Sequence, residues 1–337
     1  MAAAAQLAPR QRTQPNAPRS IFVLRNNDLG DLLVVTPLFA ALKRAFPQAR
    51  IAAGVGSWNA EILEGNPHVD EIVPINAPWH NQRIRPQGLG PGLKYVAFSS
   101  EARLLTERKF EIGIDVLGSP FGSLLLMRAG IPWRLGVRGY AGGQSGVQQA
   151  IDFDPSVHVG RAALRFAEAL GATDLPENRP QLFLGKNAGP EGHIVLAPGG
   201  GFREKCWPVE SFAALARSLA PRKIVVIGGE GDRSLAATII QDQPHVEDLT
   251  GRLSLRETFG AIARSALVVC NSSMAMHAAA AFRKPCVVLL GDHFDDAEAH
   301  ARLWGYPETQ VLGRGPARPA IWTPEETLPI ILDSIPR

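Results

Sequence analysis

The sequence predicts an α/β protein built from two doubly wound domains, each with a parallel sheet covered by helices. From residue 21 onward, short apolar runs of strand length alternate with longer stretches of helical period, which is typical of such sheets. The chain has 337 residues, whereas single hydrophobic cores stop growing at about 250–300 residues. A Pro-rich polar segment at 176–190 separates two series of elements, so we expect one domain on each side of it.

The first series starts with a strand at 21–24, a polar loop, a helix at 31–46 and a strand at 51–55, which together make one β-α-β unit. Residues 76–92 contain Pro, Gly and Arg with little periodicity, and we expect a functional loop there. The remaining expected elements are a helix at 93–108, a strand at 112–117, a helix at 121–129, a strand at 134–137 and a helix at 159–170.

The second series opens with a strand at 193–197 and a Gly-rich turn, and it closes with a helix at 324–335. The apolar positions of that last helix, Leu328, Ile331 and Leu332, need a partner surface. The expected elements between them are a helix after Pro208, a strand at 223–227, helices at 232–241 and 254–264, a strand at 266–270, a short helix from Ser272 and a strand at 286–290.

These patterns divide the chain into a disordered leader at 1–20, an N-terminal domain at 21–180, a C-terminal domain at 191–320 and a C-terminal helix at 321–337. The leader lacks the continuous apolar core of a secretory signal. The longest nearly apolar stretch, 32–42, is shorter than the roughly 18 residues that a membrane-spanning helix needs.

Three cysteines form no closely spaced motif, which fits a reducing compartment, so we expect a cytoplasmic protein. A net charge of +3 is too small to indicate nucleic-acid binding.

The polar loop after the first strand leads into Asp31, at the start of a helix. Ligands of open parallel sheets bind beyond the carboxyl ends of the strands, so this loop is the first candidate site. Asp31 has two interpretations, a first-turn acid that complements the helix dipole and a general base for a bound acceptor. The residues alone leave both open.

A Gly-rich stretch at 197–208 joins a buried strand to a helix in the second series. Gly200 and Gly201 allow the backbone to approach a ligand closely, and Lys205 adds a positive charge. The stretch matches neither the Walker loop nor the dinucleotide fingerprint. Glu230, after a strand that ends in two glycines, is either a ligand of a ribose or a solvated loop acid.

A third stretch, Asn271 to His277, follows a buried strand and opens a helix, so its free N–H groups suit a diphosphate. Ser272 and Ser273 are equally suited to simple N-capping, and His277 to packing inside the helix. Residues 292–300 hold many acids and histidines but no established metal-ligand spacing, so we expect a polar helix start there, and neither a metal nor a cofactor.

Taken together, three motifs resemble glycosyltransferase family 9, the heptosyltransferase family of lipopolysaccharide core assembly. They are Asn27-Asp28-Leu29-Gly30-Asp31 with Thr36-Pro37 downstream, Lys205-Cys206-Trp207-Pro208, and the stretch 271–280. The resemblance covers residues 21–337 in order and spacing. It implies a GT-B architecture, in which two Rossmann-like domains face each other across a cleft and the last helix crosses back to the first domain.

The resemblance also implies an inverting, metal-independent transfer from ADP-heptose, with the acceptor bound by the N-terminal domain and the donor by the C-terminal domain. Asp31 would be the catalytic base. Ligands of the donor would include Glu230 for the ribose and Leu253 against the adenine. The departing diphosphate would lie against Gly200, Gly201, Lys205, Ser272, Ser273, Met274 and His277.

The sequence departs from the family pattern at Ser272 and Met274, where an Asp and a Gly are usual. Two alternatives therefore stand beside the heptosyltransferase: a member that uses another nucleotide sugar, and a non-catalytic nucleotide-sugar-binding protein. A nicotinamide-dependent oxidoreductase is disfavoured because neither half has the dinucleotide fingerprint after its first strand.

The expected acceptor is a lipid-linked or core oligosaccharide, with no nucleic-acid partner. Peripheral membrane association would follow if six basic residues form a rim: Arg83, Arg85, Lys94, Arg103, Arg108 and Lys109.

Overall fold

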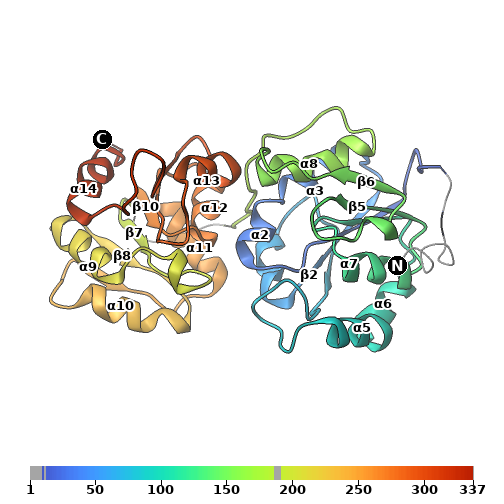
Figure 1. The fold of residues 1–337 in the computed structure, drawn as a ribbon, viewed down its shortest axis with the longest axis horizontal. Coiled ribbons are helices and arrows are strands. Elements are labelled where there is room, and N and C mark those ends of the chain that lie inside the picture. The colour runs from blue at the N-terminus through green and yellow to red at the C-terminus, as the bar shows by residue number, and fades with distance from the viewer. Residues whose placement is uncertain (1–9, 11–12, 186–190, 337) are drawn as a thin grey trace. The chain divides into compact units, whose positions relative to one another are not determined.

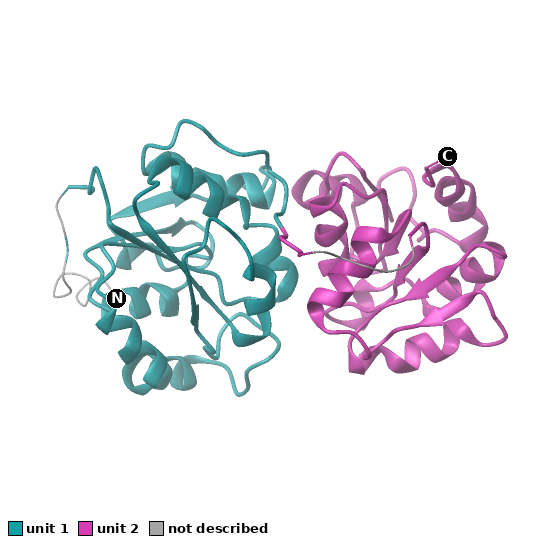
Figure 2. Ribbon diagram, turned by 180° about the vertical axis from the view of Figure 1, so that it is seen from behind, with its two compact units in different colours: residues 1–181 teal, residues 182–337 magenta. Residues whose placement is uncertain are grey.

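The computed structural model describes residues 10, 13–185 and 191–336. The chain forms two compact units, Met1–Gln181 and Leu182–Arg337 (Figure 2). Residues 1–9 and 11–12 of the expected leader lie outside the described residues. Within the rest of the leader, the Gln14 amide donates to the Leu170 carbonyl at 3.0 Å and Ser20 already begins the first strand. The first strand therefore begins one residue earlier than expected, at Ser20.

The first unit contains a six-stranded parallel sheet in the order β3-β2-β1-β4-β5-β6. Its strands are β1 (Ser20–Leu24), β2 (Arg50–Val55), β3 (Glu71–Pro74), β4 (Ile112–Asp115), β5 (Trp133–Arg138) and β6 (Gln149–Asp152). Its α-helices are α2 (Leu29–Leu33), α3 (Pro37–Ala45), α4 (Ala60–Leu63), α5 (Leu89–Phe98), α6 (Ser100–Glu107), α7 (Pro120–Arg128) and α8 (Val159–Ala169). Helices α3 and α8 pack together, while Phe22 of β1 shares a core with Val96, Leu105 and Leu125 of α5, α6 and α7 (Figure 1).

The second unit repeats this plan with a parallel sheet in the order β12-β11-β10-β7-β8-β9. Its strands are β7 (Ile194–Ala197), β8 (Ile224–Val226), β9 (Val246–Asp248), β10 (Leu267–Cys270), β11 (Cys286–Leu289) and β12 (Thr309–Leu312). Its α-helices are α9 (Val209–Ser218), α10 (Arg233–Ile240), α11 (Leu255–Arg264), α12 (Met274–Ala281), α13 (Ala297–Trp304) and α14 (Pro324–Asp333). The core joins Leu196 of β7 to Phe212, Ile239 and Ile331 of α9, α10 and α14.

In each sheet the chain winds outward from the first strand and then crosses to that strand's other side. The two switch points lie between β1 and β4 and between β7 and β10. Leu24 is opposite Asp115 at the first, and Ala197 is opposite Cys270 at the second. Both sheets thus have the Rossmann order, in which ligands bind beyond the carboxyl ends of the strands at the switch point. The expected α/β class with two doubly wound domains is confirmed.

Two of the predicted helices are each divided in the structure. The helix expected at 31–46 becomes α2 and α3, since the Thr36 hydroxyl bonds back to the preceding turn at 2.7 Å and Pro37 opens a new helix. The helix expected at 93–108 becomes α5 and α6, because extended Ser99 caps the second of them with its side chain.

The C-terminal helix α14 packs within the second unit, and its expected contact with the N-terminal domain stays a prediction. Its Ile331 is fully buried in the core that α9 contributes to, and Leu328 packs against the same core. The Trp207 indole N–H donates to the Trp322 carbonyl at 2.7 Å, just before the helix. Leu328 and Ile331 therefore find their partner surface on α9 and its surroundings, whereas Leu332 is 42% exposed.

Candidate functional site

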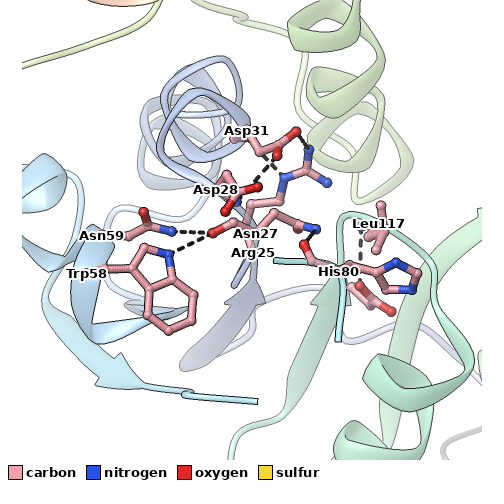
Figure 3. A network of polar contacts seen from close by, with 9 residues as sticks. Arg25, Asn27, Asp28, Asp31, Trp58, Asn59, His80 and Leu117 are labelled. Carbon is pink, nitrogen blue, oxygen red and sulfur yellow. Dashed lines mark hydrogen bonds and ion pairs between the residues drawn. The ribbon is translucent and has the colours of Figure 1, made fainter. Parts of the chain in front are cut away.

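The loop after β1 is held in one conformation by Asn27 (Figure 3). The Asn27 carbonyl accepts from the Trp58 indole N–H at 3.0 Å and from the Asn59 amide at 2.8 Å. The Asn27 amide in turn donates to the carbonyl of His80 at 2.7 Å. The segment from 76 to 92 therefore contacts the switch point, as expected of a functional loop, and the backbone leading to Asp31 is fixed.

Asp31 lies in the first turn of α2 with its carboxylate oriented by two groups (Figure 3). Its Oδ1 is 3.1 Å from the guanidinium Nη2 of Arg25, and its Oδ2 accepts from the Asp28 N–H at 3.3 Å. The Arg25 side chain is 6% exposed, whereas that of Asp31 is 34% exposed. Asp31 therefore completes the capping box of α2 and still presents a carboxylate to solvent, so the two interpretations of this residue are compatible.

Asp28, three residues earlier, is the half-buried N-cap of α2. Its Oδ1 accepts from the Gln82 N–H at 3.1 Å, which brings the 76–92 segment over the loop. Burial raises the pKa of the Asp28 carboxyl, although the hydrogen bond from Gln82 opposes the shift. Asp28 is thus tied to the loop, whereas the Asp31 carboxylate is 34% exposed.

The second unit holds its two site loops together through the buried side chain of Asn271, directly after β10. Its Oδ1 accepts from the Trp207 N–H at 2.9 Å, and its amide donates to the Pro198 carbonyl at 2.6 Å. Since Pro198 directly follows β7, the Gly-rich loop and the start of α12 form one rigid surface.

Lys205 lies on this surface, partly buried among aromatic rings. Its Nζ is 5.3 Å from the ring centroid of Phe202 and 5.6 Å from that of Phe294. Among the described residues, no carboxylate lies within salt-bridge distance of Lys205. An ammonium group held over aromatic faces and not neutralised by an acid is well suited to bind an anionic ligand.

Close packing explains why positions 199 and 200 of the Gly-rich loop suit glycine. A Cβ on Gly199 would come within 2.7 Å of the Asp232 carboxylate, and one on Gly200 within 2.6 Å of the Cys206 sulfur. Gly201 is exposed. A side chain at position 200 would therefore displace the Cys206 sulfur, whatever ligand the loop binds, and the donor roles of Gly200 and Gly201 stay predictions.

Glu230 and the 251–253 turn lie close together. The Glu230 carboxylate is exposed and accepts from the Arg233 Nε at 2.8 Å. Gly251 has a φ of +66°, and a Cβ there would meet Glu230 Oε2 at 2.7 Å. The structure thus brings Glu230 next to the turn that carries partly buried Leu253, as a ribose and adenine site requires, but their roles stay predictions.

The start of α12 is not capped by a side chain. Ser273 is the N-cap residue, but its hydroxyl makes no capping hydrogen bond, and the Ser272 hydroxyl instead lies 2.8 Å from His300 Nε2. Ser272, Ser273 and Met274 are partly exposed. The simple N-capping interpretation of the two serines is therefore wrong, and the first turn keeps N–H groups for a ligand.

Sequence comparison decides the family. The sequence profile described as "Glycosyltransferase family 9 (heptosyltransferase)" matches residues 99–311, which is more than half of the chain. The chain belongs to glycosyltransferase family 9. A curated relative, "Lipopolysaccharide heptosyltransferase 2" of Salmonella typhimurium strain LT2, is 27% identical over 305 residues, which cover 82% of this chain and 84% of the relative.

Solved structures share the fold of this family 9 glycosyltransferase. "Structure of E. coli ADP-heptose lps heptosyltransferase II" has a TM-score of 0.74 at 22% identity and covers 94% of this chain and 98% of its own. "E. coli heptosyltransferase WaaC with ADP-2-deoxy-2-fluoro heptose" has a TM-score of 0.74 at 15% identity and covers 93% and 99%. These similarities confirm the GT-B class predicted for this family 9 enzyme, with two Rossmann-like domains.

His277 and residues 292–300 are the last predicted features of this family 9 enzyme. His277 is 4% exposed inside α12, and its Nδ1 lies 2.7 Å from the Tyr306 hydroxyl, so the side chain is hydrogen-bonded in the interior of the unit, and its donor role stays a prediction. Asp296 caps α13 by accepting from Ala299 N–H at 2.9 Å, which confirms the polar helix start.

The described residues contain no group of three or more His, Cys, Asp or Glu side chains placed to hold a metal ion. Nor does any helix among them have the length and apolarity to cross a membrane.

Sequence reasoning missed two buried titratable residues of this family 9 enzyme. His300 of α13 is 5% exposed, and burial, aided by the charge of Lys205, lowers its pKa to about 4. Asp115, at the end of β4, is also buried, and desolvation raises its pKa to about 6. Its two oxygens accept from the Leu117 N–H at 3.2 Å and the Ser119 N–H at 2.7 Å. The partner of His300 is distant in the sequence, whereas those of Asp115 are two and four residues on, in a turn that sequence reasoning did not single out.

Asp115 predicts a specific dependence of stability on pH. Because its pKa is about 6 in the folded state and about 3.9 in an unfolded chain, the folded state binds more protons between these values. The free energy of unfolding should therefore fall by roughly 2 kcal/mol from this residue as pH rises from about 4 to 7. Urea unfolding of the wild type and Asp115→Asn at pH 4 and 7 measures it. An equal pH dependence in both proteins would contradict the assignment.

Proposed function

We propose that this protein transfers heptose from ADP-heptose to a lipopolysaccharide-core or related glycan acceptor, with inversion at the anomeric carbon. Membership of glycosyltransferase family 9 and the similarity to lipopolysaccharide heptosyltransferases support this activity. The observation that carries the proposal is that each unit has one suitable charged group near the switch point of its sheet. These are the oriented, partly exposed carboxylate of Asp31 and the ammonium group of Lys205 beside the uncapped start of α12.

In the proposed reaction, an acceptor hydroxyl attacks the anomeric carbon of the donor sugar. The new glycosidic C–O bond forms as the bond from the anomeric carbon to the diphosphate oxygen breaks, and ADP leaves with the electron pair. Asp31 takes the hydroxyl proton as general base. Arg25 and the Asp28 N–H hold the Asp31 carboxylate in place, so its orientation does not depend on bound substrate.

The second unit would stabilise the charge that develops on the departing diphosphate. Lys205 supplies a full positive charge, and the first turn of α12 supplies N–H groups and the positive end of the helix dipole. Gly200 and Gly201 would let the diphosphate approach the loop. Glu230 would accept hydrogen bonds from the ribose hydroxyls, and Leu253 would lie against the adenine. No step in this scheme requires a metal or a cofactor.

A thermal-shift panel of nucleotides and nucleotide sugars tests the donor assignment. A ligand that binds only the folded state raises stability by mass action, about 2.7 kcal/mol at 100 times its Kd. We expect stabilisation by ADP and more by ADP-heptose, with none by UDP or GDP at equal concentration. Stabilisation by another nucleotide alone would keep the fold and contradict the donor. ADP binding without sugar transfer would support the non-catalytic alternative.

We also propose that α5 and α6 dock on an anionic lipid surface. Leu93 and Phe98 of α5 are 45% and 76% exposed, although the opposite face of α5 is buried against the core. Lys94 and Arg103 flank them and make no ion pair within the described ranges, whereas Arg108 of the expected basic rim pairs with Glu71. A second copy of the chain would place like charges opposite one another, so an anionic membrane is the better partner.

Vesicle sedimentation tests this docking surface. We expect the wild type to bind vesicles that contain phosphatidylglycerol and not vesicles of phosphatidylcholine alone. Replacing Leu93 and Phe98 by Ser should weaken binding at least about tenfold, since each buried apolar side chain contributes about 1.5–3 kcal/mol. Phe153→Ser is the matched control, because Phe153 is another exposed aromatic residue of the same unit. Equal binding by all three proteins would contradict the proposal.

A further inference from the structure

A hydroxyl–imidazole pair borders Lys205 in the second unit. His300 Nε2 is 2.8 Å from the Ser272 hydroxyl oxygen, and the imidazole is 5% exposed. Its ring lies edge-on to Phe294 with centroids 4.9 Å apart, and Lys205 is stacked on that same Phe294 ring. Ser272 is the second residue after β10 and stands two residues before α12. The pair therefore belongs to the surface on which we place the diphosphate.

The surroundings of His300 determine which atom of the pair donates. The second ring nitrogen, Nδ1, is buried and has no hydrogen-bond partner among the described residues. A buried N–H without a partner is rarer and costlier than an under-satisfied acceptor, so the ring proton belongs on Nε2. Nε2–H then donates to the oxygen of Ser272. The Ser272 O–H consequently points away from His300 and is left to donate to a ligand.

The groups around Ser272 form a set of hydrogen-bond donors. Lys205 contributes an ammonium group, and the start of α12 contributes backbone N–H groups. The acids of the adjoining loop are engaged elsewhere: Asp295 pairs with Arg314 at 3.0 Å, and Asp296 caps α13. A cluster made of donors selects a ligand atom that can only accept, such as an ionised phosphate oxygen, over a sugar hydroxyl.

We propose that His300 is a positioning residue, which fixes the Ser272 hydroxyl as a hydrogen-bond donor to the diphosphate of the nucleotide. The inference rests on the proposed function, because it assigns a new pair to the same donor site.

Calorimetric titration with ADP, and with adenosine as a probe without phosphates, tests the role of Ser272. Ser272→Ala should weaken ADP binding about tenfold, the usual effect of removing a hydrogen bond to a charged group. Ser272→Asp should weaken ADP binding further, since it adds like-charge repulsion, and neither variant should change adenosine binding. If Ser272 instead contacts a sugar hydroxyl, Ser272→Asp would leave ADP binding unchanged, which would overturn the proposal.

The role of His300 is tested with His300→Phe, which keeps a ring and removes the N–H donor. We expect a loss of ADP affinity similar to that of Ser272→Ala, and no further loss in the double variant, because the two residues act as one unit. His245→Phe is the matched control, since His245 of the same unit also bonds through Nε2, to the Ala216 carbonyl at 2.9 Å. It should leave ADP binding unchanged.

The two proposals fail in different ways. If the wild type binds no ADP, the proposed donor is wrong. If the wild type binds ADP and His300→Phe binds it equally well, the positioning role of His300 is wrong while the donor stands. Melting temperatures of all variants check that each one is folded, and a variant that melts early is replaced by His300→Gln, which restores a side-chain N–H donor and should recover part of the ADP affinity.

Discussion

Asp31→Asn should lower the turnover number by about 10²–10⁴-fold, the usual contribution of a general base. The substitution is isosteric, and an amide oxygen can still accept from the Asp28 N–H, so α2 should keep its capping contact. ADP and ADP-heptose should bind to the variant as to the wild type, because we place the donor on the other unit. Initial rates of ADP release at saturating donor and acceptor measure the loss.

Asp174→Asn is the matched control for Asp31. Asp174 also pairs with an arginine of the same unit, Arg44, at 3.3 Å, but it lies outside the switch point and is exposed. Its replacement should leave turnover unchanged, since exposed ion pairs contribute little to stability. Turnover within a factor of about three of the wild type in Asp31→Asn would rule out the general-base role.

Lys205→Ala should lower kcat/KM by about 10²–10³-fold, because it removes a full positive charge from the site of the departing diphosphate. The effect should appear both in weaker ADP binding and in slower transfer, since the charge on the diphosphate grows as the sugar leaves. Lys205→Arg should recover only part of the activity, because a guanidinium group has a different shape and stacks differently on Phe202 and Phe294.

Lys223→Ala serves as the control for Lys205. Lys223 is another lysine of the second unit and pairs with Glu247 at 3.3 Å on the surface. Its replacement should change neither ADP affinity nor turnover. An unchanged kcat/KM in Lys205→Ala would mean that the diphosphate binds elsewhere, and the donor site on the second unit would then be wrong.

The interior strands could be predicted from the sequence, and the edge strands could not. Strands such as β1 and β10 are buried on both faces, so each appears as an uninterrupted apolar run. The expected elements omitted β3, β6, β9 and β12, which are the outermost strands of the two sheets. Each of them has one neighbour, is partly exposed and includes polar residues, as in Glu71-Ile72-Val73-Pro74. Sequence periodicity alone does not distinguish such a segment from a loop.

In the candidate site, too, residues in local motifs could be predicted from the sequence, and residues defined by long-range contacts could not. Asp31 and Lys205 could be predicted because each follows a buried strand and lies within a local motif. His300 could not, because its partner Ser272 is 28 residues away in the sequence, on the loop between β10 and α12. The packing of α14 on α9 was likewise beyond the sequence, since an amphipathic helix indicates that a partner surface exists and not which one.

Direct detection of transfer tests the central claim of this account most sharply. The purified protein is incubated with ADP-heptose and a deacylated lipopolysaccharide-core acceptor, and the acceptor is analysed by mass spectrometry and NMR. We predict an acceptor heavier by one heptosyl residue, one ADP released per residue added, and an anomeric configuration opposite to that of the donor. Release of ADP with free heptose and no modified acceptor, or no consumption of ADP-heptose by a protein that binds it, would contradict the proposed transferase.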